Sequence, residues 1–201
     1  MINMRPIALA LGLALSLNVG ATTLNGSLTA DNEFLAYIST SDAVLGTQIS
    51  SGNNWQATYT FSGVSLTGGG DYYLHIVARD WGRPEALIGQ FTLSDSNYHF
   101  ANGTQVQFTN TSDWRASDGT WGNWTAPTTS PEDRGLNGVA PWGTRTGVSS
   151  DAHWIWSKNY GSGTSYFSTT ITAAVPEPET FGMLLAGLGL LGVVAHRKRA
   201  A

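Results

Sequence analysis

Alternation of apolar and polar positions runs through residues 22–174 and predicts an all-β domain. In residues 72–78, Tyr72, Leu74, Ile76 and Ala78 share one face, because side chains alternate across a strand. Similar runs occupy residues 34–40, 55–61, 64–66, 87–93, 154–156 and 166–172. Gly, Asn, Asp and Ser separate these runs, and no useful helical period lies between the two terminal segments. Many short strands joined by turns predict one antiparallel β-sandwich or barrel.

The same pattern predicts which side chains form the core of this domain. The expected core includes Leu74, Ile76, Phe91, Ile171, Trp55, Trp154 and Trp156. Residues 22–174 make one domain that is long enough to bury such a core without disulfides.

An uncharged apolar run at the N-terminus predicts a secretory signal peptide over residues 1–21. Residues 1–5 carry one positive charge, residues 6–19 carry none, and small residues precede a cleavage point after Ala21. An uncleaved N-terminal anchor is the alternative interpretation.

A second uncharged run, residues 181–195, lies near the C-terminus and predicts a membrane helix. It follows a Pro/Glu linker that two prolines keep extended, and it ends at the basic residues 197–199. As a helix the run would reach about 22 Å, short of a hydrocarbon core of about 30 Å. Snorkelling basic side chains extend that reach, and the basic end would stay cytoplasmic. The alternative is a buried C-terminal helix of the domain.

The C-terminal segment, residues 175–201, resembles the PEP-CTERM sorting signal that exosortases process. The motif residues are Val175, Pro176, Glu177, Pro178, Thr180, Arg197, Lys198 and Arg199. The resemblance implies an exosortase-type enzyme as partner and a precursor held in the inner membrane by the helix. It also implies cleavage near Pro176–Thr180, after which the protein would reside at the cell surface or in the extracellular matrix.

Composition narrows the chemistry of the domain. The chain has no cysteine, which excludes disulfides, thiolate catalysis and Cys-based metal sites. Residues 22–174 contain twelve Asp and Glu against six Lys and Arg, a net charge of −6. This acidic balance argues against nucleic-acid binding, which needs a basic surface.

The middle of the domain resembles galactose-binding-like jelly-roll domains. The resemblance rests on residues 30–34, on the run from Leu66 to Asp80 with its following turn, and on residues 154–157. It implies a single jelly-roll-like β-sandwich. It also implies a structural Ca²⁺ near Asp31, Asn32 and Glu33, whose oxygens are ligands that Ca²⁺ prefers. The same residue types also begin turns, so the motif has a second interpretation.

Tryptophans in loop-like sequence predict a ligand-binding surface. Trp81 follows the long predicted strand, and four others lie among Gly, Asp, Asn, Thr and Pro: Trp114, Trp121, Trp124 and Trp142. Exposed rings can stack on sugars while neighbouring polar groups bond hydroxyls. The alternative is that these rings cover the ends of the sandwich as a satellite core.

Catalytic motifs are weak in this sequence, and we expect no enzyme. No Gly-x-Ser-x-Gly elbow and no zinc spacing of histidines occurs. The adjacent acids Glu132 and Asp133 would need a third acid opposite them to serve glycoside hydrolysis. The sequence therefore predicts an exported, non-catalytic domain that binds an exopolysaccharide or another surface glycan. The alternative is a structural envelope or biofilm-matrix component without a specific ligand.

Overall fold

The computed structural model describes residues 21–158, 163–174 and 178–199. Nearly all of the predicted signal peptide therefore lies outside the described residues, as do Val175, Pro176 and Glu177 of the sorting motif.

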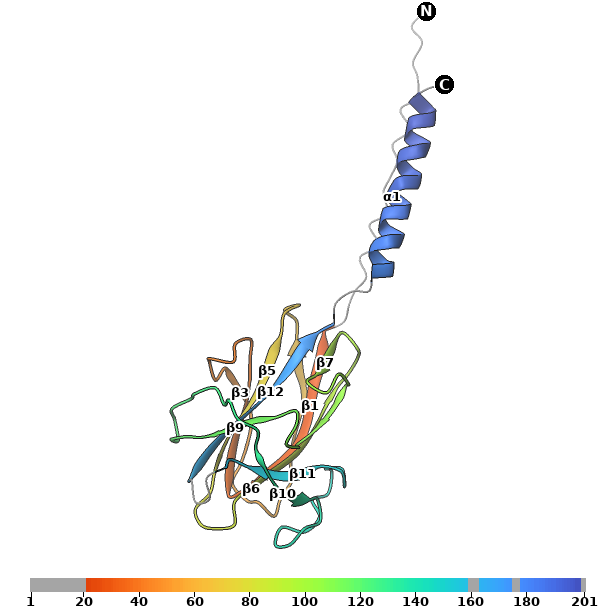
Figure 1. Cartoon of the computed structure of the whole chain (residues 1–201). Helices are drawn as coiled ribbons and strands as arrows, with labels where there is room; N and C mark the ends of the chain where they lie inside the picture. Colours follow the sequence, from red (N-terminus) through yellow and green to blue (C-terminus); the bar gives the residue numbers. More distant parts are fainter. Residues whose placement is uncertain (1–20, 159–162, 175–177, 200–201) are drawn as a thin grey trace, which may run out of the picture.

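Two antiparallel sheets face each other, as the alternating pattern predicts (Figure 1). The first sheet contains β1 (Thr22–Asp31), β4 (Tyr59–Leu66), β6 (Ala86–Leu93), β8 (Val106–Phe108), β10 (Glu132–Leu136) and β11 (His153–Trp156). Its order is β10-β11-β6-β1-β4, with β8 also beside β6. The second sheet contains β2 (Glu33–Ser39), β3 (Thr47–Gly52), β5 (Tyr72–Arg79), β7 (Tyr98–Phe100), β9 (Arg115–Asp118) and β12 (Thr164–Ala173). Its order is β3-β2-β5-β12-β7, with β9 also beside β12.

The main core fills the space between the two sheets. Leu74, Ile76, Phe91 and Ile171 are all fully buried there, which confirms the prediction from the alternating pattern. Aromatic pairs join the two sheets in this core: the ring of Trp156 on β11 lies 5.7 Å from that of Phe167 on β12.

A second, smaller core lies on the outer face of the first sheet. It contains Ala86, Ile88, Trp142, Val148, Ala152 and Trp154. The chain between β10 and β11 returns over this face, and the Trp142 and Trp154 rings stack 5.0 Å apart. Strand β6 is consequently covered on both sides, because Leu87 and Phe91 point into the main core while Ala86 and Ile88 point into the second.

The prediction that Trp55 lies in a strand and belongs to the core is wrong. Trp55 is half-buried in a turn, and β4 begins only at Tyr59. The turn forms because the Asn54 side chain accepts the Gln56 N–H at 3.0 Å, a local bond that competes with strand pairing. The Trp55 ring packs at the edge of the second core with the Arg145 guanidinium over it, 5.6 Å from the ring centre.

The long helix α1 (Pro178–Arg199) follows the sandwich and contains the predicted apolar run. Figure 1 shows it leaving the end of the sandwich at which β12 finishes. Five of its leucines are exposed: Leu184, Leu185, Leu188, Leu190 and Leu191. Among the described residues, no helix combines the length and apolar character needed to cross a membrane.

Truncation of one core side chain should measure how much the main core contributes. Phe91→Ala removes a fully buried ring and should lower the free energy of unfolding by about 3–5 kcal/mol. Phe61→Ala is the matched control, because Phe61 packs on Phe91 but is only partly buried and should cost less. Urea unfolding followed by fluorescence checks both, and equal losses would contradict the assignment of the core.

Candidate functional site

Four side chains from distant segments meet at one end of the second sheet. The guanidinium of Arg79, the last residue of β5, pairs with the Glu33 carboxylate of β2. Its central carbon lies 4.2 Å from the Trp121 ring centre and 5.5 Å from that of Trp81. We call Glu33, Arg79, Trp81 and Trp121 the Trp–Arg cluster. It joins two of the predicted ligand-binding tryptophans around one cation, an arrangement that cation–π attraction stabilises.

Hydrogen bonds from the chain around Asn32 hold the turn that carries Trp81. The Trp81 N–H donates to the Asn32 side-chain oxygen at 2.7 Å, and the Asn32 N–H donates to the Arg79 carbonyl at 2.9 Å. With its backbone fixed, the Trp81 ring remains 63 % exposed. Among the described residues of the sandwich it is the most exposed large apolar side chain, so the ring is free to make a contact outside the domain.

The loop after β9 is held against the outer face of the second sheet by Tyr166. The Tyr166 hydroxyl accepts the Thr120 N–H at 3.1 Å and donates to the Thr120 carbonyl. Gly119 permits this approach, because a Cβ there would lie 2.2 Å from the Tyr166 ring. The loop therefore has a fixed path, and Trp121 reaches Arg79 from it.

Trp124, in the same loop, faces the sheet instead of solvent. Its ring lies 4.3 Å from the His75 ring and 5.2 Å from the Tyr166 ring. Its indole N–H donates to the Asp42 carbonyl at 3.0 Å. The cavity left beneath this loop measures only about 50 Å³, which is too small for a sugar ring. Trp124 thus fixes the loop and offers little surface to a ligand.

His75, fully buried beneath Trp124, belongs to a polar network centred on Asp42. The His75 Nε2 atom lies 3.2 Å from a carboxylate oxygen of Asp42. The Nδ1 atom lies 3.2 Å from the carbonyl oxygen of Leu45. Asp42 also accepts a hydrogen bond from Ser168 at 2.8 Å and pairs with Arg115 at 3.0 Å. Ser168 bonds the carboxylate and not the imidazole, so the three side chains do not form a nucleophile–base pair.

The pKa values of His75 and Asp42 are both lowered, but for different reasons. Burial lowers the pKa of His75 and outweighs its bonds to Leu45 and Asp42, which act the other way. Burial alone would raise the pKa of Asp42, but the Ser168 bond and the Arg115 charge outweigh it and hold that pKa below its usual range. The folded network therefore favours neutral His75 and ionised Asp42.

Two of the five predicted ligand-binding tryptophans are buried, which corrects the expectation that they form an exposed surface. Trp114 is 1 % exposed and packs on Phe91, and Trp142 is 4 % exposed within the second core. Their sequence neighbourhood is rich in turn residues, which describes the local backbone. Burial depends instead on where the chain returns to a sheet. The structure thus brings Trp81 and Trp121 together, and leaves Trp114, Trp124 and Trp142 to packing.

The predicted calcium ligands have separate protein partners. Asp31 accepts hydrogen bonds from the Trp142 indole at 2.9 Å and from the Asn32 amide at 2.7 Å. Glu33 pairs with Arg79, and the Asn32 oxygen accepts from Trp81. In the part of the chain that the structure describes, no three His, Asp or Glu side chains are grouped as metal ligands. The residues as placed do not fit a preformed Ca²⁺ site.

Asp31 instead has acidic neighbours that the sequence did not point to. Burial raises the pKa of Asp31, the Trp142 bond opposes the rise, and the charges of Asp80 and Glu85 add to it. Burial likewise raises the pKa of Asp80, against bonds from the following turn. Three carboxylates, Asp31, Asp80 and Glu85, therefore lie near one another at this end of the sandwich, where the Arg83 charge acts on Asp80 and Arg134 lies 3.8 Å from Glu85.

Arg79 is the residue of the candidate site that the sequence analysis did not predict. The period-two pattern of β5 places Tyr73, His75, Val77 and Arg79 on the face opposite the core, so the signal was present. The strand register then sets Arg79 beside Glu33, a pairing that requires knowledge of which strands are neighbours.

Comparison with known proteins identifies the C-terminal segment. The family model of the PEP-CTERM protein-sorting motif matches residues 174–199, which confirms the resemblance seen in the sequence. The motif indicates an exported protein that an exosortase sorts to the cell surface. No curated protein and no solved structure matches the chain. The jelly-roll and galactose-binding-like resemblance of the sandwich therefore stays a prediction.

The buried histidine should make the domain sensitive to acid. Because the folded-state pKa of His75 is lowered, the unfolded chain takes up its proton first as the pH falls. Stability should be full above about pH 6.5 and decline as the pH falls toward the folded-state pKa, by at most about 1.4 kcal/mol per pH unit. Thermal unfolding between about pH 7.5 and pH 5.5 measures this decline in the histidine range.

His75→Gln should flatten that decline, whereas the control His99→Gln should preserve it. The raised pKa values of Asp31 and Asp80 act with the opposite sign, so the informative quantity is the difference between variants. Identical pH dependence in the His75→Gln variant and the parent chain would contradict the assignment.

Proposed function

We propose that this exported protein binds a surface or matrix polysaccharide through its Trp–Arg cluster and performs no catalysis. The observation that carries the proposal is the meeting of Trp81 and Trp121 at one guanidinium, although the two rings come from different loops. A flat exposed ring beside hydrogen-bonding groups is the usual composition of a sugar-binding surface.

The polar groups around the rings supply the hydrogen bonds that a sugar requires. Arg79 provides N–H donors and Glu33 provides carboxylate acceptors, and their pairing holds both in place. Stacking with a few hydrogen bonds gives dissociation constants in the millimolar to micromolar range, about −4 to −8 kcal/mol. Many copies at one surface would raise the avidity well above that of a single domain.

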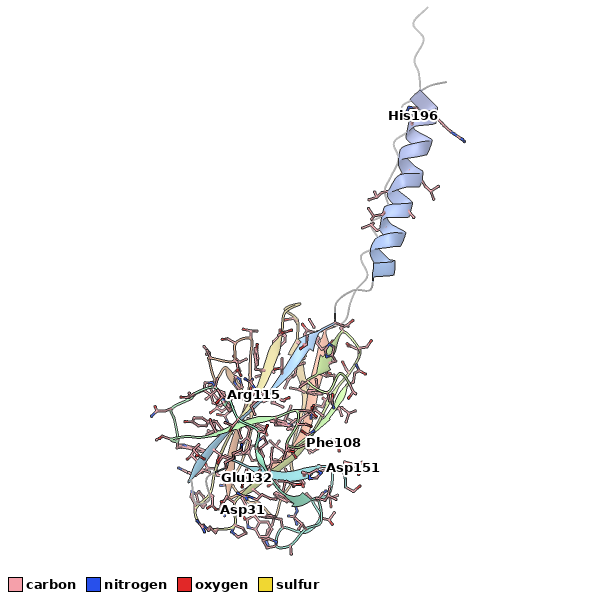
Figure 2. All side chains as sticks on the ribbon, viewed as in Figure 1. Asp31, Phe108, Arg115, Glu132, Asp151 and His196 are labelled. Atoms are coloured by element: carbon pink, nitrogen blue, oxygen red, sulfur yellow. The ribbon has the colours of Figure 1, made fainter. Side chains whose placement is uncertain are left out.

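The position of the cluster suits presentation at a surface. Strand β12 begins at Thr164, which pairs with Arg79 of the cluster, and runs to Ala173 just before the sorting tail. In Figure 2 the labelled Asp31, whose neighbour Asn32 holds Trp81, lies at the end of the sandwich away from α1. The cluster and the tail thus lie at opposite ends of the domain.

For the tail, we propose that α1 anchors the precursor in the inner membrane until an exosortase-type enzyme cuts near Pro176–Thr180. The exposed leucines of α1 and the basic residues at its C-terminal end support this topology, with the basic end on the cytoplasmic side. The mature protein would then reside at the cell surface or in the extracellular matrix.

A structural matrix role without a specific ligand is the second candidate. The observation that favours it is the burial of Trp114 and Trp142 together with the loop-fixing position of Trp124. These three rings act as packing elements, and a domain with a rigid cysteine-free core could serve the matrix by its bulk alone.

Removal of either ring of the Trp–Arg cluster should separate the two candidates. Trp81→Ala and Trp121→Ala should each weaken retention on the cognate polysaccharide by about tenfold or more while leaving the melting temperature nearly unchanged. Leu136→Ala is the control, because Leu136 is an exposed apolar side chain of β10, on the other sheet. Affinity electrophoresis in extracellular polysaccharide measures retention, and unchanged mobility of both tryptophan variants would favour the matrix role.

Mass spectrometry of the mature protein tests the sorting proposal. We expect a C-terminus near residues 176–180, without the basic residues Arg197, Lys198 and Arg199. Replacement of Pro176 and Pro178 by Ala should leave an uncut precursor in the membrane fraction. A surface-exposed protein that retains Arg199 would contradict processing.

A further inference from the structure

An open hollow of about 320 Å³ borders the Trp–Arg cluster on the side away from the tryptophans. Its lining comes from β2, from the end of β3 and from the start of β4: Glu33, Phe34, Leu35, Ser51, Gly52, Asn53 and Tyr59. Glu33 therefore belongs both to the cluster and to the hollow.

The strand register makes the cluster and the hollow continuous. Across neighbouring strands Glu33 lies beside Arg79, and the next residue, Phe34, lies beside Gly52 at the end of β3. Leu35 lines the hollow and also the small cavity under Trp121, so it bridges the two on the outer face. The path from β5 over β2 to β3 covers two strand spacings, about 10 Å.

Packing fixes the far wall of the hollow. The Tyr59 ring meets the Phe34 ring edge-on at 5.6 Å, and it lies so close to β3 that a Cβ on Gly52 would be 2.5 Å from it. The Tyr59 hydroxyl accepts the Asn53 N–H at 3.3 Å. Ser51 and Asn53 are exposed beside it, so the wall offers hydroxyl and amide groups in a rigid setting.

We propose that the cluster and the hollow form one extended groove that binds an internal stretch of a linear, uncharged polysaccharide. One sugar ring stacks on the tryptophans of the cluster, chiefly on the exposed Trp81, and the next rings cross β2 to reach Ser51, Asn53 and the Tyr59 hydroxyl. The groove is longer than a single pyranose ring, and the open hollow lets the chain continue. This inference rests on the proposed function, and it adds the length and charge class of the ligand.

Charge favours a neutral ligand. The one cation of the cluster, Arg79, is already paired with the Glu33 carboxylate, so an anionic ligand would have to compete with Glu33 for it. An anionic chain would also be repelled by the domain as a whole, because residues 22–174 carry a net charge of −6. Hydroxyl and acetamido groups need only the hydrogen bonds that the groove supplies.

Oligosaccharides of increasing length test the groove. The purified full chain in detergent is titrated by calorimetry with cello-oligosaccharides and chito-oligosaccharides, from monosaccharide to hexasaccharide. We expect the affinity to rise by about tenfold or more from the disaccharide to the tetrasaccharide in one series and then to level off. A uronic-acid oligomer of the same length should bind at least tenfold more weakly.

Two variants locate the gain in affinity. Asn53→Ala combined with Tyr59→Phe should abolish most of the gain in affinity with length, while Trp121→Ala should weaken binding at every length. Gln48→Ala is the matched control, because Gln48 is exposed on the same strand β3 away from the hollow. Thermal melts establish that each variant is folded.

Equal affinity for monosaccharide and hexasaccharide would overturn the groove proposal. It would leave the proposed function standing, because the cluster would then bind the end of a chain. The groove would also be overturned by length-dependent binding that survives the Asn53 and Tyr59 substitutions. Absence of binding to every oligosaccharide would overturn both proposals.

Discussion

Indole N–H groups fasten the long loops of this cysteine-free sandwich to other parts of the domain. The three bonds join Trp114 to the Phe108 carbonyl at 3.0 Å, Trp124 to the Asp42 carbonyl at 3.0 Å and Trp142 to the Asp31 carboxylate at 2.9 Å. Each ring also packs on aromatic neighbours, so one side chain provides both burial and a directional bond. Without disulfides, the shape of these loops depends on such bonds.

The geometry of the Trp–Arg cluster follows from these buried attachments. Trp124 and Tyr166 hold the loop after β9 on the sheet, and Trp121 reaches Arg79 because its neighbours are fixed. Trp81 depends in the same way on Asn32, whose neighbour Asp31 is tied to the second core through Trp142. A ligand that stacks on these rings would therefore meet a surface that is already ordered, which reduces the entropy lost on binding.

The alternation of apolar and polar residues predicted the strands well, because each strand carries this alternation in its own sequence. The run 72–78 lies within β5, and its alternate residues Leu74 and Ile76 are buried as expected. The roles of the loop tryptophans could not be derived in this way: the partner of Trp142 lies 111 residues away, at Asp31. A turn-rich neighbourhood shows that the chain bends there but not which face it then covers. The Arg79–Glu33 pair could not be predicted for the same reason, because it depends on which strands are neighbours.

The strand β12 joins the two ends of the domain in a way that matters for mechanical load. Its first residue, Thr164, pairs with Arg79 of the cluster, and its last, Ala173, directly precedes the tail segment. A pull between a bound polymer and the C-terminal end of the mature domain would act along β12, while the hydrogen bonds of β12 to β5 run perpendicular to that direction. The load would thus shear the whole ladder at once instead of unzipping it bond by bond, the geometry in which a sheet resists force best.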